Sequence, residues 1–437
     1  KHCIVATGSR IHEIPAAYDV PVWSSAEALR LPNIPERLAV VGGGYIGLEM
    51  AEQLRRRGLT VSLVEAMPQV MAPLDPEMAA LLHPELKQHG VDLYLNDPVT
   101  TFEPSENAAA AEASVVVLRS GQRLPADVVV LGLGVKPETD LAKQAGLELG
   151  PTGGIRVDDR LRTTDPAIWA VGDAIEVREF VTGQPALVPL AGPANRQGRI
   201  AADNIFGRDS TYAGTLGTAA LRLFDLTAGC TGPNESVLRA AAIPFEKVHL
   251  HPFSHAGYYP GATPIALKIL FAPDTGKLLG ASAVGKQGVE KRIDVLATAL
   301  KAGLTVQDLA ELELAYAPPF SSAKDPVNLA GMIAQNVLAG DVQVAHWNEV
   351  GDLDPDRTML LDVRGEEERQ GGGIPGSVHL PLPQLRARLS ELPKGKEIIV
   401  HCASGQRSYY ACRILNQHGF RTRNLSGSYK TWKAATG

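Results

Sequence analysis

The fold is decided by the stretch Val40-Val41-Gly42-Gly43-Gly44-Tyr45-Ile46-Gly47-Leu48-Glu49, which joins the end of an apolar strand, a glycine turn and the start of a helix. In such a turn Gly42 allows the tight bend, Gly44 lets a pyrophosphate approach the backbone, and Gly47 lets the helix pack closely on the strand. The amino end of the helix then stabilises the phosphate charge. The stretch therefore predicts a dinucleotide-binding βαβ unit.

The residues that follow the turn support this prediction. Residues 47–57 have the pattern of an amphipathic helix that Gly58 ends, and residues 60–65 alternate as a second strand with Glu65 at its end. A carboxylate at this spacing binds both ribose hydroxyls and repels a 2′-phosphate, which favours NADH. The arginine run at residues 55–57 leaves NADPH open, although such a run on one helix is typical of a solvated face.

The length and composition describe an ordinary protein of several domains. A chain of 437 residues is expected to form two to four domains, at roughly 100 to 200 residues each. The hydrophobic fraction of 45% and the charged fraction of 21% are typical of soluble proteins, and no stretch has the length and apolarity of a membrane span. The longest apolar run, residues 128–135, is predicted to be a buried parallel strand.

Charge and cysteine content exclude several function classes. The net charge of −6 and the pI of about 6.0 argue against a nucleic-acid partner and favour small molecules. The four cysteines have neither metal-ligand nor paired spacing, so no metal site and no disulfide framework is predicted, and a reducing cytoplasm fits best. Three of them, Cys3, Cys230 and Cys412, are predicted to be packing residues.

Two further motifs flank the glycine turn. Ala6-Thr7-Gly8-Ser9 with Pro15 precedes it, and Ile168-Trp169-Ala170-Val171-Gly172-Asp173-Ala174 follows it. Their order resembles that in FAD-dependent pyridine nucleotide-disulfide oxidoreductases, in which the NAD domain is inserted into the FAD domain. The resemblance implies that Asp173 binds the ribityl hydroxyls of FAD; the alternative is an Asp that caps the next helix. The predicted cofactor-binding residues are Thr7, Gly8, Gly42, Gly44, Tyr45, Ile46, Gly47, Glu65, Gly134, Gly172 and Asp173.

Members of this family begin with a flavin-binding glycine fingerprint followed by a redox-active cysteine, and this sequence contains neither. We therefore expect an N-terminal truncation before Lys1, of at least one βαβ unit of about 30 residues. For the 437 residues as they stand, we expect sulfurtransferase activity to be retained where flavin reduction is lost.

Residues 203–336 change to a pattern of strands, helices and aromatic loops, as in the dimerisation domain of that family. Residues 255–262 and 313–326 resemble its coenzyme A-disulfide reductase and NADH oxidase branch. The resemblance implies that Tyr258 and Tyr316 reach the active site of the partner in a homodimer, where a phenol can protonate a leaving thiolate. It also implies that Lys324 binds substrate. The alternatives are a loop aromatic for Tyr258 and a solvated charge for Lys324.

One arginine completes this set of predicted site residues. Arg196, in the segment 192–199, is expected on a helix near the flavin and is assigned to substrate binding. The alternative is a cationic helix face in solvent.

After a predicted linker at residues 343–348, a second signal occurs near the end of the chain. A strand at residues 397–401 leads into Cys402-Ala403-Ser404-Gly405-Gln406-Arg407, and residues 408–417 form a helix that ends near Gly419. Backbone amides converging on Cys402 favour a thiolate or a persulfide, and Arg407 adds a fixed positive charge. We therefore assign Cys402 and Arg407 as catalytic residues.

This six-residue loop resembles that of rhodanese sulfurtransferases, whereas related phosphatases surround phosphate with a longer loop. Residues 360–364 and 424–432 also match rhodanese patterns, so the resemblance extends from residue 344 to the end. The predicted fold class is α/β, with Rossmann-like FAD- and NAD(P)-binding domains, an α+β dimerisation domain and a C-terminal α/β rhodanese domain. The predicted boundaries are 1–32 and 147–205 for the partial FAD domain, 33–146 for the NAD(H) domain, 206–338 for the dimerisation domain and 344–437 for the rhodanese domain.

The predicted function is NADH- and FAD-dependent reduction of coenzyme A disulfide, persulfide or polysulfide, linked to sulfur transfer by Cys402. Two alternatives remain open: an NADH oxidase or peroxidase with a passenger rhodanese, and a non-catalytic persulfide carrier or sensor. The sequence leaves the sulfur donor and acceptor unidentified.

Overall fold

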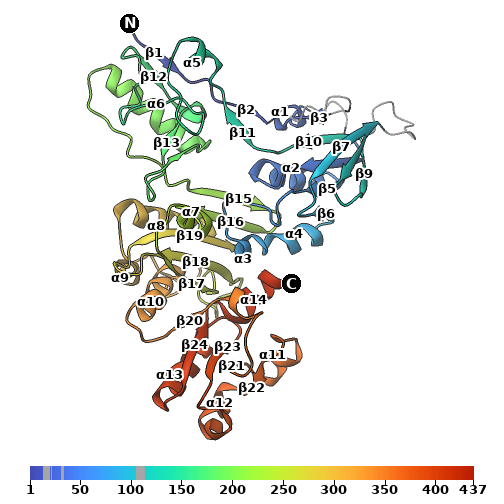
Figure 1. The fold of residues 1–437 in the computed structure, drawn as a ribbon, viewed down its shortest axis with the longest axis vertical. Coiled ribbons are helices and arrows are strands. Elements are labelled where there is room, and N and C mark those ends of the chain that lie inside the picture. The colour runs from blue at the N-terminus through green and yellow to red at the C-terminus, as the bar shows by residue number, and fades with distance from the viewer. Residues whose placement is uncertain (13–19, 21, 31–33, 105–113) are drawn as a thin grey trace. The chain divides into compact units, whose positions relative to one another are not determined.

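The computed structural model describes residues 1–12, 20, 22–30, 34–104 and 114–437 (Figure 1). The chain divides into two compact units. Unit 1 comprises Lys1–Leu74, Leu82–Asp225 and Thr231–Pro233, and unit 2 comprises Asp75–Leu81, Leu226–Cys230 and Asn234–Gly437. The predicted domain boundaries stay predictions, and Pro15 lies outside the described residues.

Unit 1 consists of short strands and helices. They are β1 (Cys3–Val5), β2 (Ser9–Ile11), β3 (Val22–Trp23), α1 (Ser25–Ala28), β4 (Arg37–Val41), α2 (Tyr45–Arg56), β5 (Thr60–Val64), α4 (Leu82–Gln88), β6 (Val91–Tyr94), β7 (Val99–Pro104), β8 (Ser114–Leu118), β9 (Arg123–Ala126), β10 (Val128–Leu131), β11 (Val135–Pro137), α5 (Asp140–Gln144), β12 (Ile168–Ala170), η2 (Gly172–Ala174), β13 (Val177–Arg178), β14 (Pro185–Ala186), α6 (Ala191–Ile205) and β15 (Ala219–Leu223).

A five-stranded parallel sheet with the order β3-β10-β4-β5-β6 carries the glycine turn. Its inner strands are apolar and buried, as expected of a parallel sheet covered on both faces. On one face, Val41, Val64 and Val129 pack with Phe102 and Val116 of the three-stranded sheet β7-β8-β9. Helix α2 packs against β4 and β5. This packing fixes the end of β4, where the glycine turn begins.

Unit 2 contains an antiparallel and a parallel sheet. Its elements are α3 (Pro76–Ala79), β16 (Leu226–Thr231), α7 (Glu235–Ala240), β17 (Glu246–Leu250), β18 (Ile265–Phe271), β19 (Leu278–Gly285), α8 (Val289–Ala302), α9 (Val306–Glu311), α10 (Pro326–Leu338), β20 (Val344–Ala345), η3 (Trp347–Glu349), β21 (Thr358–Asp362), α11 (Glu366–Gln370), β22 (Val378–His379), α12 (Leu382–Leu385), η4 (Arg386–Glu391), β23 (Glu397–His401), α13 (Gln406–Gln417), β24 (Arg421–Leu425) and α14 (Ser428–Thr436).

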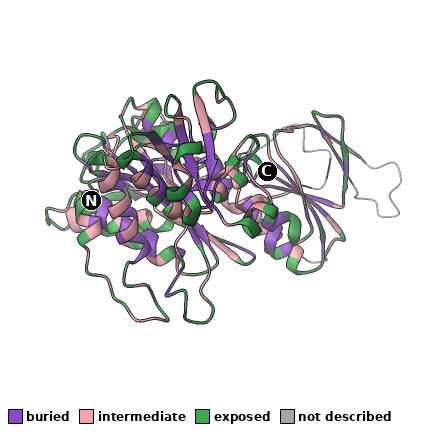
Figure 2. Cartoon of the chain, turned by 90° about the horizontal axis from the view of Figure 1, so that it is seen from below, coloured by how far each residue is buried: buried purple, intermediate pink, exposed green. Residues whose placement is uncertain are grey.

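The parallel sheet of unit 2 has the order β20-β24-β23-β21-β22. Alternate residues point to opposite faces: Leu361 and Val400 join one apolar cluster, and Leu360 and Ile399 join the other. Figure 2 shows the buried residues concentrated in the strands and on the inner sides of the helices, with the loops exposed. The strand β23 therefore ends in a fixed position, directly before Cys402.

Several predicted elements are observed, with three corrections. The run at residues 128–135 forms a buried parallel strand only as far as Leu131, because the chain crosses the glycine turn at Gly132 and Val135 begins the antiparallel strand β11. Cys3 is exposed on β1, whereas Cys230 and Cys412 are buried as predicted. The segment 343–348 is not a plain linker, since β20 belongs to the parallel sheet.

The arginine run on α2 is not simply solvated. Arg55 donates hydrogen bonds to the backbone oxygens of His89 and Leu59, at 2.8 and 2.9 Å, and Arg56 pairs with Glu52 at 2.7 Å. These contacts anchor two of the three arginines in the packing of unit 1. No described helix combines the length and the apolar character that crossing a bilayer requires.

Candidate functional site: a nucleotide pocket and a thiol loop

The glycines of the turn after β4 differ in how closely other atoms approach them. Gly42 has φ +109°, and a Cβ there would lie 2.5 Å from the Gly132 backbone oxygen. A Cβ on Gly47 would lie 1.8 Å from the Gly42 oxygen, whereas a Cβ on Gly44 would meet no atom within 4 Å. Gly42 and Gly47 are therefore required by packing, and Gly44 leaves room for a ligand beside the backbone.

A cavity of about 660 Å³ opens in front of this turn. The predicted residues that line it are Gly42, Gly44, Tyr45, Ile46, Glu65 and Gly134. Glu65 accepts hydrogen bonds from Gly43 N at 2.6 Å and Met67 N at 2.9 Å. These bonds fix the carboxylate at the end of β5, where it can meet a ribose. No residue of the arginine run 55–57 lines the cavity.

The segments assigned to FAD meet at one edge of unit 1. Strands β1 and β12 are parallel neighbours, so the loops after them lie together. Ser9 Oγ donates to Asp173 Oδ2 at 2.8 Å, and Thr7 Oγ1 donates to the Glu138 backbone oxygen at 2.6 Å. Gly8 and Gly172 have φ values of +73° and +77°, and a Cβ on Gly8 would meet no atom within 4 Å. The structure thus brings Thr7, Gly8, Gly172 and Asp173 together at an open backbone edge that fits the FAD assignment.

Helix α6 lies against these segments, and it contributes a residue that was not predicted. Gln197 is buried, and its Oε1 accepts a hydrogen bond from Gly172 N at 2.8 Å. Arg196, the residue predicted to bind substrate, is exposed on the same helix. Gln197 was not among the predicted residues, although it stands in the segment 192–199 and the helical period points it toward the loop.

In unit 2, the two predicted tyrosines meet although 58 residues separate them in the chain. Their hydroxyls lie 3.3 Å apart, and this hydrogen bond raises the pKa of Tyr258. Both rings are accessible, with exposed fractions of 78% for Tyr258 and 49% for Tyr316. Lys324 is also exposed, just before α10. The hydrogen bond from Ala256 N to Ser321 O, at 2.9 Å, joins the two segments.

The loop after β23 surrounds a buried thiol. Cys402 is only 1% exposed, and its Sγ accepts hydrogen bonds from Gly405 N at 3.1 Å and from Ser408 Oγ at 3.4 Å. Gly405, with φ +104°, turns the chain into α13. The amino end of this 12-residue helix therefore faces the sulfur.

These donors decide the ionisation of the thiol. Burial by itself raises the pKa of Cys402, but hydrogen bonds from the Ser408 hydroxyl and from the backbone of Ser408, Ser404 and Gly405 outweigh it and lower the pKa. In contrast, burial raises the pKa of Cys412 to about 12. The loop therefore favours a thiolate at Cys402 and an inert thiol at Cys412.

Two residues that the sequence analysis missed complete the loop. Ser428 Oγ accepts from Cys402 N at 3.1 Å and lies 3.2 Å from Ser408 Oγ. Glu368, on α11, binds both terminal nitrogens of Arg407 at 2.6 Å. Neither has a local sequence signal that links it to Cys402, because Glu368 lies on α11 and Ser428 begins α14.

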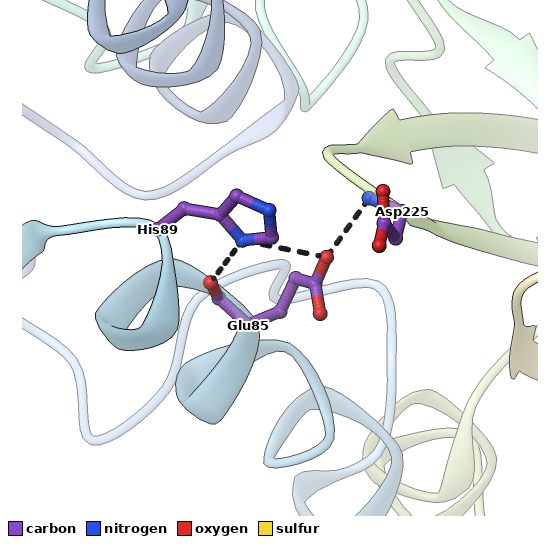
Figure 3. A group of neighbouring side chains, drawn as sticks. All are labelled: Glu85, His89 and Asp225. Atoms are coloured by element: carbon purple, nitrogen blue, oxygen red, sulfur yellow. Dashed lines mark hydrogen bonds and ion pairs between the residues drawn. The ribbon is translucent and has the colours of Figure 1, made fainter.

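Among the described residues, two groups of side chains bring metal-ligand types close together. Glu85, His89 and Asp225 form the first (Figure 3), where His89 Nδ1 bonds the Glu85 backbone oxygen at 2.9 Å and Asp225 N donates to Glu85 Oε1 at 2.8 Å. The second, Asp75, Glu77 and Glu235, contacts the Lys268 ammonium group. The prediction that the protein binds no metal stays a prediction.

Family models match three parts of the chain. The model of pyridine nucleotide-disulphide oxidoreductases matches residues 1–194, the dimerisation domain of the same proteins matches 218–326, and the rhodanese-like domain matches 346–435. The chain belongs to the pyridine nucleotide-disulphide oxidoreductase family. The predicted family and fold class are thus confirmed, including the C-terminal rhodanese domain.

Relatives of this chain include enzymes named for different activities. An NADH oxidase from Methanocaldococcus jannaschii is 36% identical over 70% of this chain, and a coenzyme A disulfide reductase from Staphylococcus haemolyticus is 34% identical over 69%. The chain covers 66% of the length of each, slightly less than two thirds. The matched family binds FAD and NAD(P)H.

Two solved structures match nearly the whole chain. Reduced CoADR-RHD from Bacillus anthracis is 45% identical with a TM-score of 0.94, over 99% of this chain and 79% of that chain. An NAD-dependent persulfide reductase from A. fulgidus is 36% identical with a TM-score of 0.88, over 99% and 80%. Both similarities extend through the thiol loop.

Proposed function

We propose that this oxidoreductase uses NADH and FAD to reduce coenzyme A disulfide, persulfide or polysulfide, and that Cys402 transfers sulfur. One observation carries the proposal: a fixed ribose-binding carboxylate at Glu65 and an activated thiol at Cys402 occur in one chain. The similarity to a coenzyme A disulfide reductase and to a persulfide reductase supports it.

In the nucleotide half, Glu65 binds the ribose hydroxyls and the turn at Gly44 admits the pyrophosphate. Asp173 and the backbone at Thr7 and Gly8 would hold the flavin. Bound there, FAD would supply two-electron redox chemistry between the nicotinamide and a sulfur substrate. The carboxylate at Glu65 disfavours a 2′-phosphate, so we propose NADH as the preferred donor.

In the rhodanese domain, the Cys402 thiolate attacks the outer sulfur of a persulfide R–S–SH. A bond forms between the Cys402 sulfur and the outer sulfur, the S–S bond of the donor breaks, and the departing R–S⁻ takes up the proton of the outer sulfur to leave as R–SH. The product at Cys402 is a persulfide anion, which the amides of residues 404, 405 and 408 stabilise as they stabilise the thiolate. A thiol or cyanide acceptor then removes the sulfur and restores the thiolate.

We also propose that the protein acts as a homodimer. The exposed phenols of Tyr258 and Tyr316 share a hydrogen bond, which suits donation of a proton to a leaving thiolate in the partner's site. The exposed Lys324 binds an anionic part of the substrate, as Arg196 does nearer the flavin. Sedimentation should give twice the chain mass, and a monomer would contradict this part of the proposal.

Since all four cysteines are free thiols, a reducing cytoplasm is the proposed location.

The sulfur-transfer half is tested with the full chain and the variant Cys402→Ser. Turnover of glutathione persulfide with cyanide as acceptor should fall by at least about 100-fold, because the attacking thiolate is removed. The exposed Cys3→Ser is the matched control and should keep its activity. Undiminished turnover in Cys402→Ser would exclude sulfur transfer by this thiol.

The competing proposal is an NADH oxidase with a passenger rhodanese, which the similarity to the M. jannaschii protein favours. The distinguishing measurement is anaerobic NADH consumption. Turnover with coenzyme A disulfide or polysulfide supports the reductase, and turnover with oxygen alone supports the oxidase.

A further inference from the structure

The positively charged residue of the thiol loop, Arg407, already binds a carboxylate, that of Glu368. Glu368 Oε1 and Oε2 accept one hydrogen bond each from Arg407, from Nη2 and Nη1, both at 2.6 Å. Glu368 Oε2 also accepts from Gly365 N at 3.1 Å, which ties the carboxylate to the start of α11. Both side chains are thus held in a two-point geometry, which is the strongest arrangement that arginine makes with a carboxylate.

This pair is accessible to solvent, whereas the thiol is buried. The side chains of Arg407 and Glu368 are 38% and 39% exposed, whereas Cys402 is 1% exposed. Arg407 also interacts electrostatically with the Cys402 sulfur. An anionic sulfur donor that approaches Cys402 therefore meets Arg407 and Glu368 together.

Charges of both signs surround Glu368. Its neighbours Glu366 and Glu367 are exposed on the same first turn of α11. The nearby cations Arg364 and Arg369 both pair with the buried Asp362, at 2.7 and 3.2 Å. Hydrogen bonds from Arg407, with a smaller contribution from the charge of Arg364, lower the pKa of Glu368, so the carboxylate is ionised and neutralises Arg407.

Sulfur donors differ in what they need from Arg407. Thiosulfate carries a trigonal sulfonate group that must leave as sulfite, and the planar fork of arginine matches such an oxyanion. An organic persulfide loses a thiol and presents no oxyanion at the reacting sulfur. Because Glu368 fills the fork and repels a dianion, it raises the barrier for thiosulfate far more than for an organic persulfide.

We propose that Glu368 determines donor specificity, directing Cys402 to organic persulfides and away from thiosulfate. The inference rests on the proposed sulfur transfer. In the disfavoured reaction, the Cys402 thiolate forms a bond to the outer sulfur of thiosulfate, the bond between the two thiosulfate sulfurs breaks, and sulfite departs with that electron pair. Cyanide then takes the sulfur as thiocyanate and regenerates the thiolate, so atoms and charge balance.

The test compares Glu368→Gln with Glu367→Gln in the full chain. Each change removes one negative charge from α11, but only Glu368 contacts Arg407. A glutamine at residue 368 can still accept the bond from Gly365 N, which preserves the helix start. In Glu368→Gln, kcat/KM for thiosulfate should rise about tenfold, and kcat/KM for glutathione persulfide should change by less than about threefold.

The dependence of this gain on salt concentration distinguishes an electrostatic role of Glu368 from a purely structural one. The gain with thiosulfate should shrink between low ionic strength and about 0.5 M NaCl, because screening weakens the repulsion in the parent protein. Glu367→Gln should show less than about a twofold gain. Glu368→Ser, which also removes the charge, should reproduce the preference of Glu368→Gln.

An unchanged donor preference in both residue-368 variants would overturn the inference, and so would an equal loss with both donors. Cys402→Ser separates this failure from that of the proposed function. If Cys402→Ser is inactive while the residue-368 variants keep the parent preference, sulfur transfer stands and the role of Glu368 does not.

Discussion

Ser408 Oγ donates a hydrogen bond to Cys402 Sγ at 3.4 Å, inside a loop where both residues are buried. The same hydroxyl lies 3.2 Å from Ser428 Oγ, which in turn accepts a hydrogen bond from Cys402 N. The sulfur is thus held by a side-chain network in addition to the backbone amides. Because the thiolate is the nucleophile, the Ser408 hydroxyl acts on reactivity by lowering the pKa of Cys402.

Removing the hydroxyl in Ser408→Ala should raise the pKa of Cys402, since a donor to the thiolate is lost. Sulfur transfer at neutral pH should fall about fivefold, as expected for one hydrogen bond of about 1 kcal/mol. The loss should be recovered at higher pH, where the thiol ionises without help. The measurement is the pH profile of Cys402 alkylation by iodoacetamide, beside that of turnover.

Ser404→Ala is the matched control for that variant. Ser404 stabilises the thiolate through its backbone N–H, which alanine retains. Its alkylation profile should overlay the parent profile. An unshifted profile in Ser408→Ala would show that the backbone amides alone set the reactivity of Cys402.

The thiol loop shows which part of the site a sequence reveals. Cys402, Arg407 and the following helix are contiguous, so local geometry determines their arrangement and the pattern identifies them. Glu368 precedes Arg407 by 39 residues, and Ser428 follows Cys402 by 26. Their contacts depend on which strands of the sheet are neighbours, and that depends on packing across the whole domain.

A pair of glycine substitutions distinguishes packing from ligand access in the nucleotide half. Gly44→Ala should fold normally, because its Cβ meets no atom within 4 Å, but should bind NADH at least about tenfold more weakly. Gly47→Ala should instead lower the free energy of unfolding by about 3 kcal/mol or more, because its Cβ would overlap the Gly42 backbone oxygen. Urea denaturation and NADH fluorescence titration measure the two effects. Equal stability of the two variants would contradict the distinction.

The glycine turn was predictable because strand, turn and helix follow one another in the chain. The limits of β10 were not, since the apolar run continues past Leu131 and only the crossing at Gly132 ends the strand. Likewise, a run of arginines indicates a solvated face until the packing of α2 shows that Arg55 reaches the His89 and Leu59 carbonyls. Tertiary contacts, which leave no local pattern, decide both cases.

A buried ion cluster in unit 2 suggests a test of stability. The Lys268 ammonium lies 2.8 Å from Asp75 and also contacts Glu77 and Glu235, and all four side chains are buried. Lys247 contributes a second ammonium, 2.8 Å from Glu235. The cluster joins α3, α7, β17 and β18.

Lys268→Met should destabilise the protein by about 3 to 5 kcal/mol, because three buried carboxylates lose the counter-charge that they share. The destabilisation should lessen at lower pH, where protonation relieves the uncompensated charge. Urea denaturation at two pH values measures both effects. Lys277→Met, at an exposed position, is the control and should change stability by less than about 0.5 kcal/mol.

His401, the residue before the reactive thiol, is fully buried. Neither of its ring nitrogens has a hydrogen-bond partner within the described part of the chain, and Nδ1 lies 3.9 Å from Asp362 Oδ1. Burial lowers the pKa of His401 to about 4, so its neutral form belongs to the folded state. The unfolded chain, with a histidine pKa near 6.5, takes up the proton more readily.

The contribution of His401 to stability is therefore complete above about pH 6.5 and is lost as the pH falls toward 4. Between pH 7 and pH 5, protonation of this histidine in the unfolded chain should lower the free energy of unfolding by about 2 kcal/mol. His401→Leu, which breaks no hydrogen bond, should reduce the loss over this range by that amount, as measured by urea denaturation at each pH. His418→Leu, at an exposed position, controls for removal of an imidazole in general. An equally steep acid loss in His401→Leu would assign the pH dependence to other groups.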